Sequence, residues 1–300
     1  MGTPRSYQTE AIIIKQTKLG EFDKLITLYT PEFGKLKAVA KGACRPKSKL
    51  GGNVEPLTHS LMLLAKGRNL DIVTQSQTID GFLDLKSDLW RISCGLYILE
   101  LIDSFTMENS ESRPLFDLLL DTLRQLCQTD SKEIVLRYFE LHLLHYLGYR
   151  PQLRCCVMCN SPLTPVVNFF SFSQGGVLCP HCNSKENRHY EPFASSVIAS
   201  RSSEQREETM KQFHSSQDKL HKAISLKSSF PLSVDALKIL RLWQDCDYAT
   251  ARRVKVKSEL SSELEQVLQG YIVYLLQQRV KSVTWLEELK KSLDNSGGGD

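Results

Sequence analysis

Residues 156–182 read CVMCNSPLTPVVNFFSFSQGGVLCPHC, and this stretch carries the strongest structural signal in the chain. It holds two C-x2-C pairs, Cys156 with Cys159 and Cys179 with Cys182, separated by nineteen residues. Each pair presents two sulfurs to one side of a metal ion, and two pairs supply the tetrahedral set of ligands that zinc prefers. The spacing therefore predicts one structural Zn2+ ion as the cofactor of the chain.

The residues between the two pairs predict a β-hairpin. Val166–Phe172 is rich in β-branched and aromatic residues, Gly175-Gly176 is a turn signal, and Val177-Leu178 leads back to the second pair. We therefore expect a small zinc module over residues 154–192.

Two other sets of ligands fit the sequence. Cys155 stands beside Cys156 and would give a C-x3-C pairing with Cys159, and His181 has a ring nitrogen that can replace a sulfur. We favour Cys156, because its two-residue spacing matches that of the second pair. Four thiolates leave no coordination position open to water, so a site of this kind organises folding and activates no nucleophile.

The sequence carries no recognisable catalytic motif. The patterns G-x4-G-K-[ST], G-x-G-x2-G, H-E-x2-H and G-x-S-x-G are all missing from it. A second metal site could be built from two pairs of residues, His142 with His145 and Asp245 with Asp247. Both pairs lie in helical sequence, where such side chains are usually ordinary surface residues and not metal ligands. We therefore expect a chain that is not an enzyme and has no catalytic residues.

Composition is that of a globular protein: 300 residues, of which 41% are hydrophobic and 24% charged. Eighteen apolar residues never run together and the N-terminus does not resemble a signal peptide, so we expect a cytoplasmic location. In that reducing compartment paired cysteines favour metal binding over disulfides, and the isolated cysteines are expected to be free thiols. They are Cys44, Cys94, Cys127 and Cys246.

Positive charge is concentrated near the N-terminus. Residues 1–80 hold twelve Lys and Arg against seven Asp and Glu, while the whole chain has a net charge of only +4. The stretch 33–54 has no acidic residue at all, which favours a polyanionic partner over a merely solvated face. The candidate DNA-binding residues are Lys35, Lys37, Lys41, Arg45, Lys47 and Lys49.

Residues 1–80 are predicted to form a small closed barrel. Five short strands punctuated by turns fit about 75 residues, and the OB-fold is the common five-stranded barrel that binds single-stranded nucleic acid. An SH3-like barrel fits the same pattern. The expected strands are Thr9–Lys15, Leu25–Thr30, Lys35–Lys41, Leu57–Ala65 and Leu70–Gln77.

Strand alternation separates an apolar from a cationic face on the third strand. Leu36, Ala38 and Ala40 are expected to point into the barrel, with Lys35, Lys37 and Lys41 on the opposite face. Residues 42–52 follow as a basic loop, which we expect to be mobile and able to close over a phosphate backbone. The aromatic residues Phe22, Tyr29, Phe33 and Phe82 are predicted to be core residues and not platforms for bases.

Beyond residue 81 the hydrophobic period becomes helical. Helices are expected from Leu85 to Leu99, from Leu115 to Leu126, from a cap at Asp130 or Ser131 to about Leu147, and again from Ser233 onward. The fold class is thus α+β and multidomain, with the zinc module inserted in a C-terminal helical domain. The expected boundaries are 1–80, 81–153, 154–192 and 193–295, and residues 194–229 form a polar insert.

This order of parts resembles the RecO family of bacterial DNA repair. The opening Thr9–Ile14 and Gly20–Leu25, the loop Lys41–Gly52, and the later Tyr271-x2-Tyr274 and Val280–Leu286 are similar to that family's signatures. One departure is Cys44, which stands where the family often carries a basic residue. The resemblance spans nearly the whole chain, and the match is poorest over residues 194–229.

The resemblance implies a recombination mediator, associated with the nucleoid, that binds single- and double-stranded DNA and anneals complementary strands. It implies three partners: RecR, RecA, and the acidic C-terminal tail of the single-stranded-DNA-binding protein (SSB). Two other classes fit the residues without the resemblance. One is a zinc-ribbon adaptor whose basic face meets an acidic protein, and the other is an OB-fold factor that binds RNA.

Overall fold

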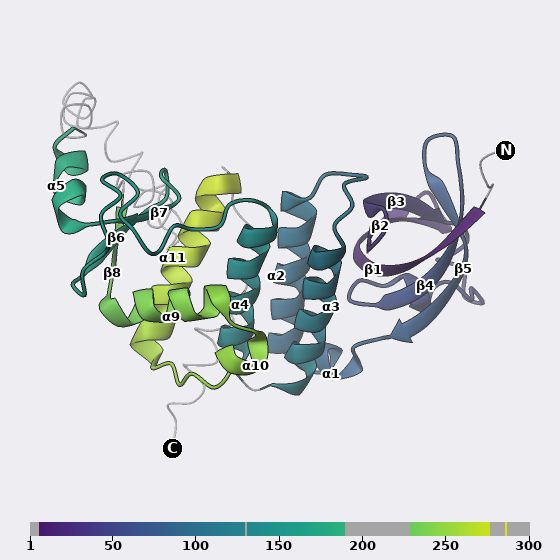
Figure 1. Ribbon diagram of the computed structural model, residues 1–300. Coiled ribbons are helices and arrows are strands. Elements are labelled where there is room, and N and C mark those ends of the chain that lie inside the picture. The colour runs from purple at the N-terminus through teal and green to yellow at the C-terminus, as the bar shows by residue number, and fades with distance from the viewer. Residues whose placement is uncertain (1–5, 130, 190–228, 277–285, 287–300) are drawn as a thin grey trace, which may run out of the picture. The chain divides into compact units, whose positions relative to one another are not determined.

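A computed structural model describes residues 6–129, 131–189 and 229–276, together with Leu286. The described chain is a mixed α+β structure (Figure 1). It divides into two compact units, the first containing the described residues up to Phe139 and the second those from Glu140 to Leu276. The first helices therefore belong to the same unit as the N-terminal strands.

Five strands close into a barrel in the order β1-β2-β3-β5-β4. All neighbours are antiparallel except β3 and β5, which pair in parallel at Ala38 with Asp71 and Val39 with Ile72. The strands lie where the sequence predicts them, and short turns at 30–34 and 66–69 join β2 to β3 and β4 to β5. Their bounds are β1 Ser6–Leu19, β2 Asp23–Thr30, β3 Gly34–Ala40, β4 His59–Ala65 and β5 Asp71–Asp80.

The interior of the barrel is a single apolar cluster. Leu36, Ala38 and Ala40 point into it, as the alternation of β3 predicts, and two larger residues from β2, Ile26 and Leu28, meet them there. A short 3-10 turn, η1 (Gly52–Val54), follows the basic loop and places Val54 in the same cluster.

Three whole helices follow in the first unit, which also holds the helical residues 132–139 and Leu286: α1 (Leu83–Lys86), α2 (Leu89–Phe105) and α3 (Arg113–Gln128). Asp88 caps α2 by accepting a hydrogen bond from the backbone N–H of Arg91. Beside the barrel, residues 106–112 connect α2 to α3 and run along β3 (Figure 1).

The second unit contains a small sheet and several helices. Strands β6 (Asn168–Ser171) and β7 (Gly176–Leu178) form the predicted hairpin, and β8 (Ser229–Leu232) adds a third strand on the other edge of β6. The sequence does not predict β8, which is only four residues long and begins where the expected polar insert ends. The helix α5 (Pro180–His189) begins directly after Cys179.

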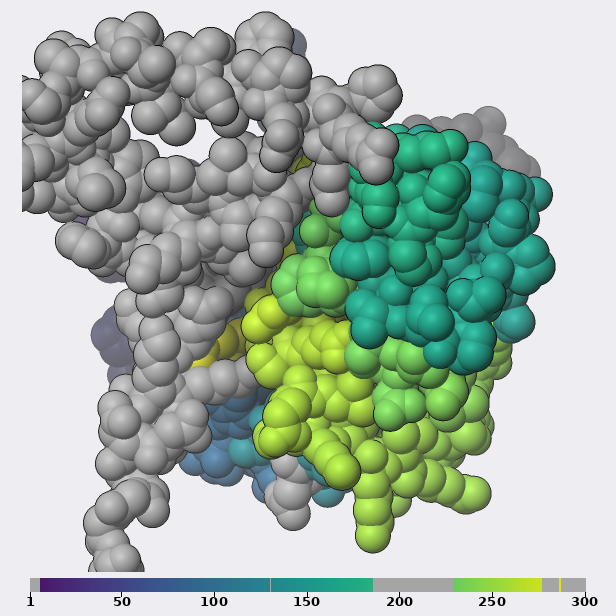
Figure 2. Space-filling view, turned by 90° about the vertical axis from the view of Figure 1, so that its left-hand side faces the viewer, coloured from purple at the N-terminus to yellow at the C-terminus, as the bar shows by residue number. Residues whose placement is uncertain are grey.

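The remaining helices are α4 (Lys132–Tyr146), α9 (Val234–Asp245), α10 (Tyr248–Ala251) and α11 (Ser258–Leu276). Gly148, with a φ of +82°, follows the end of α4, as predicted. Ser233 caps α9 by accepting from the N–H of Ala236. On the face that Figure 2 shows, the teal residues before β8 and the green to yellow helices after it form one continuous surface.

Two predicted segments lie outside the described residues. They are the insert up to residue 228, and the end of the helical segment expected from Ser233 onward, residues 277–295 apart from Leu286. Among the described helices, none combines the length and the apolar character that a membrane span needs.

Candidate metal centre and nucleic-acid interface

The four predicted cysteines converge on one point. The sulfurs of Cys156, Cys159, Cys179 and Cys182 all lie within 4.8 Å of one another, and Cys159 Sγ lies 3.9 Å from Cys179 Sγ. Zinc–sulfur bonds of about 2.3 Å in a tetrahedron imply sulfurs about 3.8 Å apart, so the spacing suits a metal ion of this size. The geometry can therefore hold a metal ion without rearrangement of the backbone.

Backbone N–H groups point at these sulfurs. The N–H of Cys179 lies 3.3 Å from Cys156 Sγ, and that of Cys182 lies 3.5 Å from Cys179 Sγ. Such hydrogen bonds stabilise thiolates over thiols. Asn160, with a φ of +55°, follows the first pair, and its N–H donates to the carbonyl of Cys156 at 2.9 Å, which closes the turn that contains both cysteines.

The protein environment alone does not ionise all four thiols. Hydrogen bonds from Ser161 lower the pKa of Cys159 to about 6, whereas burial and the neighbouring sulfurs raise the pKa of Cys182 to about 12. A bound dication reverses this balance, because its charge stabilises every coordinating thiolate. Binding of a cation and deprotonation of the four sulfurs would therefore be coupled.

The two other ligand sets do not assemble. Cys155 pairs with Pro162 in an isolated bridge and is not among the four clustered cysteines, and neither is His181. The carboxylates of Asp245 and Asp247, considered above as a second metal site, have protein partners instead. Asp245 accepts from Arg150 and Arg154, and Asp247 caps α10 by accepting from the N–H of Thr250.

Aromatic packing fixes the cysteine module to the helices of its own unit. The ring of Phe170 on β6 meets Tyr271 on α11 edge-on, with centroids 5.4 Å apart. Gly270 leaves room for Phe172, since a Cβ there would come within 2.7 Å of that ring. The hairpin between the cysteine pairs thus joins the metal centre to the core of the second unit.

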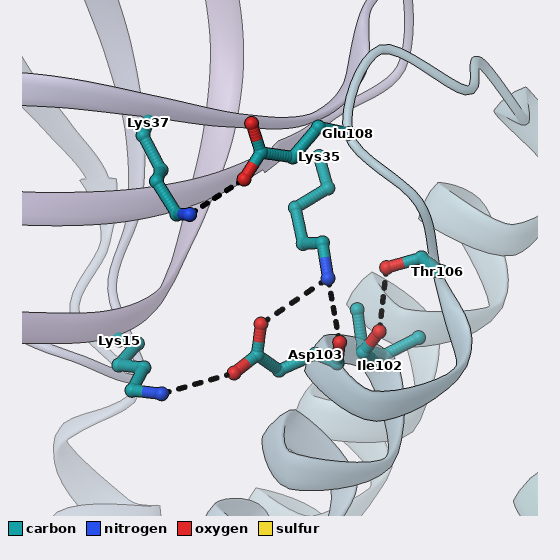
Figure 3. A network of polar contacts seen from close by, with 7 residues as sticks. All are labelled: Lys15, Lys35, Lys37, Ile102, Asp103, Thr106 and Glu108. Atoms are coloured by element: carbon teal, nitrogen blue, oxygen red, sulfur yellow. Dashed lines mark hydrogen bonds and ion pairs between the residues drawn. The ribbon is translucent and has the colours of Figure 1, made fainter. Parts of the chain in front are cut away.

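The first of the predicted basic residues, Lys35, is buried against α2. Its ammonium donates to the backbone carbonyl of Asp103 at 2.6 Å and lies 3.3 Å from the Asp103 carboxylate (Figure 3). The side chain of Lys35 is only 11% exposed. Lys35 therefore lies on the face of β3 that the alternation predicts, but its side chain is covered by α2.

Lys37 and Lys15 belong to the same network (Figure 3). Lys37 lies 2.6 Å from Glu108, in the connector between α2 and α3, and this hydrogen bond raises the pKa of Lys37. Lys15 on β1 approaches the second oxygen of Asp103 at 3.3 Å. Both acids stand far along the chain from the lysines, so the sequence does not predict these contacts.

Lys35 is expected to contribute to stability more than Lys37 does. Replacing Lys35 by Met removes a charge-assisted bond to a buried carbonyl, and we expect the free energy of unfolding to fall by about 1.5–3 kcal/mol. Lys37→Met breaks a half-exposed pair, and its effect should stay below about 1 kcal/mol. Urea unfolding of the two variants measures the difference. Equal losses of stability would show that the burial of Lys35 carries no extra energy.

The four remaining basic residues lie on the basic loop, residues 41–52, and are exposed. Within the described part of the chain, none of the three lysines among them forms an ion pair, and Arg45 lies over an aromatic ring. Hydrogen bonds within the loop order it, such as those from the N–H of Ser48 to the carbonyl of Arg45 and from the N–H of Leu50 to Ser48 Oγ. The exposed set is Lys41, Arg45, Lys47 and Lys49.

Two of the four aromatic residues predicted to be core residues are buried, and two are not. Tyr29 is fully buried and Phe82 is 2% exposed, which confirms the prediction for them. Phe22 is 42% exposed and Phe33 is 38% exposed, so the prediction is wrong for this pair. Both stand in turns between strands, where a side chain does not reach the barrel interior.

Comparison with known proteins supplies the remaining evidence. The family model for the N-terminal part of recombination protein O matches residues 4–82, and the model for its C-terminal part matches residues 86–226. The chain is 33% identical to DNA repair protein RecO of Dehalococcoides mccartyi over 292 residues, which cover 97% of this chain and 99% of that protein. It is 35% identical to RecO of a Roseiflexus species, covering 97% of this chain and 89% of that protein. The chain therefore belongs to the RecO family of DNA repair proteins.

Proposed function

We propose that this chain is a recombination mediator that binds single- and double-stranded DNA and anneals complementary strands. The observation that carries the proposal is the basic loop, whose four exposed cations follow a barrel strand in a member of a DNA repair family. Cations on such a loop contact phosphates and lower the repulsion between two backbones, while base pairing supplies the specificity. No side chain has to perform chemistry in this mechanism.

The six predicted residues take different parts in this proposal. Lys41, Arg45, Lys47 and Lys49 contact phosphates directly. Lys37 becomes available when its half-exposed pair with Glu108 opens. Lys35 fastens the end of α2 to β3 through Asp103 and so fixes the position of the surface.

We infer that the barrel is an OB-fold. The strand order β1-β2-β3-β5-β4, with one parallel pair between β3 and β5, supports this assignment over an SH3-like barrel. In OB-folds the face of the second and third strands and the loops after the first and fourth strands bind nucleic acid. Here the basic loop follows β3 and is hydrogen-bonded to Asp23, beside the turn between β1 and β2.

We also propose that the metal is one structural Zn2+ ion. Four sulfur donors at tetrahedral spacing favour zinc over the harder cations, which prefer oxygen ligands. Closed coordination gives the ion a role in folding and none in catalysis.

Family membership supports three partners: RecR, RecA, and the acidic tail of SSB. In this proposal the chain, together with RecR, helps load RecA onto single-stranded DNA that SSB covers.

The test is annealing of complementary oligonucleotides with the variant Lys41→Gln/Lys47→Gln/Lys49→Gln. The wild type should accelerate annealing, and the variant should lose most of that acceleration. Three lost phosphate contacts should also lower the slope of log K against log salt by about 2 for single strands. Fluorescence anisotropy at several salt concentrations measures this slope.

A matched control removes the same charge elsewhere. The variant Lys185→Gln/Lys238→Gln/Lys257→Gln neutralises three exposed lysines of the second unit. It should anneal like the wild type if the basic loop is the site. Equal losses in both variants would point to net charge alone. A wild type that binds no oligonucleotide at low salt would favour the protein adaptor, and stronger binding to RNA of the same sequence would favour the RNA-binding factor.

A further inference from the structure

The turn between β1 and β2 carries an exposed aromatic ring. Leu19 pairs with Asp23 to close the hairpin, and Gly20 takes a φ of +63° within the turn. Phe22 is 42% exposed there. A single exposed apolar side chain is ordinary on a protein surface, so its significance depends on what surrounds it.

Three contacts tie this turn to the basic loop. The Asp23 carboxylate accepts a hydrogen bond from the N–H of Gly42 at 2.7 Å, and the Phe22 carbonyl accepts from the N–H of Cys44 at 2.9 Å. The third contact is between side chains: the guanidinium of Arg45 lies over the ring of Phe22, 5.2 Å from its centroid. The turn and the loop thus form one surface, with the aromatic ring among the cations.

Planar groups of this kind suit a nucleobase. Every base has a π-face, and stacking on an aromatic side chain contributes about 1–3 kcal/mol per base whatever the sequence. Arg45 adds a second flat group, since guanidinium planes also stack on bases. In duplex DNA the faces of the bases are covered by their neighbours, so only an unpaired base can use such a platform.

We propose that Phe22 and Arg45 form a stacking platform for an unpaired nucleobase, through which the basic loop favours single-stranded over duplex DNA. This inference rests on the proposed DNA-binding function and gives it a strand preference. The lysines of the loop contact phosphates in either kind of DNA, and Phe22 adds affinity only where a base is free.

The test combines a change in the protein with a change in the DNA. Phe22→Leu keeps an apolar side chain but removes the π-face, and Phe22→Tyr keeps the π-face. Each protein is titrated with oligo(dT), with an abasic oligonucleotide of the same length, and with a duplex. Phe22→Leu should bind oligo(dT) about tenfold more weakly, while its affinity for the abasic strand and the duplex changes less than twofold. Phe22→Tyr should match the wild type.

Three other results are distinguishable. If Phe22→Leu weakens all three ligands equally, the ring only supports Arg45 and the loop, and the platform is refuted. The same conclusion follows if Phe22→Leu binds oligo(dT) as the wild type does. A wild type that binds none of the three ligands at low salt overturns the DNA-binding function itself, which is a separate failure.

Discussion

Cys159→Ser is expected to abolish metal binding and to unfold the hairpin module of the second unit. A serine hydroxyl is a poor ligand for zinc, and the other three sulfurs lie within 4.8 Å of one another only in the folded module. Structural zinc contributes on the order of 10 kcal/mol to modules of this size, more than their small apolar core supplies. Elemental analysis should find one zinc ion per wild-type chain and none in the variant. Hydrogen exchange should show lost protection over residues 156–182.

The neighbouring cysteine provides the control for that experiment. Cys155 differs from Cys156 by one position and lies outside the cluster, so Cys155→Ser should retain the metal and the protection. The barrel amides of β1 to β5 should stay protected in both variants, because the barrel belongs to the other unit. Zinc retained by Cys159→Ser, or lost from Cys155→Ser, would contradict the assignment of ligands.

The parts of the structure that could be predicted from the sequence depend on local rules. Two C-x2-C pairs place four sulfurs together because each turn is short and a hairpin joins them. Alternation on β3 puts Leu36, Ala38 and Ala40 inside because side chains on a strand point to opposite faces. Both features follow from neighbouring residues in the sequence and do not depend on contacts with distant segments.

The parts that could not be predicted depend on distant residues. Alternation places Lys35 outside the barrel, but cannot show that Asp103, sixty-eight positions later, covers it. Strand β8 completes the small sheet from beyond the polar insert, and a four-residue strand gives little periodicity. Phe22 differs from these cases. It was predicted to be buried and is exposed, although its position between Gly20 and Asp23 already indicates a turn, where exposure is expected.

Gly34→Ala is expected to destabilise the first unit by more than about 4 kcal/mol. A loss this large is exceptional for a single substitution and requires a specific cause such as a steric clash. Gly34 has a φ of +63°, and a Cβ there would lie 1.9 Å from the carbonyl oxygen of Ser110. That oxygen is backbone, and its segment is held against β3 by the hydrogen bond from the N–H of Asn109 to the Lys35 carbonyl at 2.8 Å. Relief of the clash therefore requires the connector to leave β3, which also breaks the backbone hydrogen bond of Asn109 and the pair of Lys37 with Glu108.

Gly20→Ala separates this clash from backbone strain. Gly20 has the same φ of +63°, but nothing lies within 4 Å of its Cβ position. Its substitution should cost only the ~1–2 kcal/mol of a left-handed backbone. Urea unfolding, with hydrogen exchange at β2 and β3, compares the two variants. A large difference shows that the connector is docked on the barrel in solution, because only docking distinguishes the two glycines. Equal, small losses would instead mean that the connector leaves β3 readily, freeing Lys37 from Glu108 to meet a phosphate backbone.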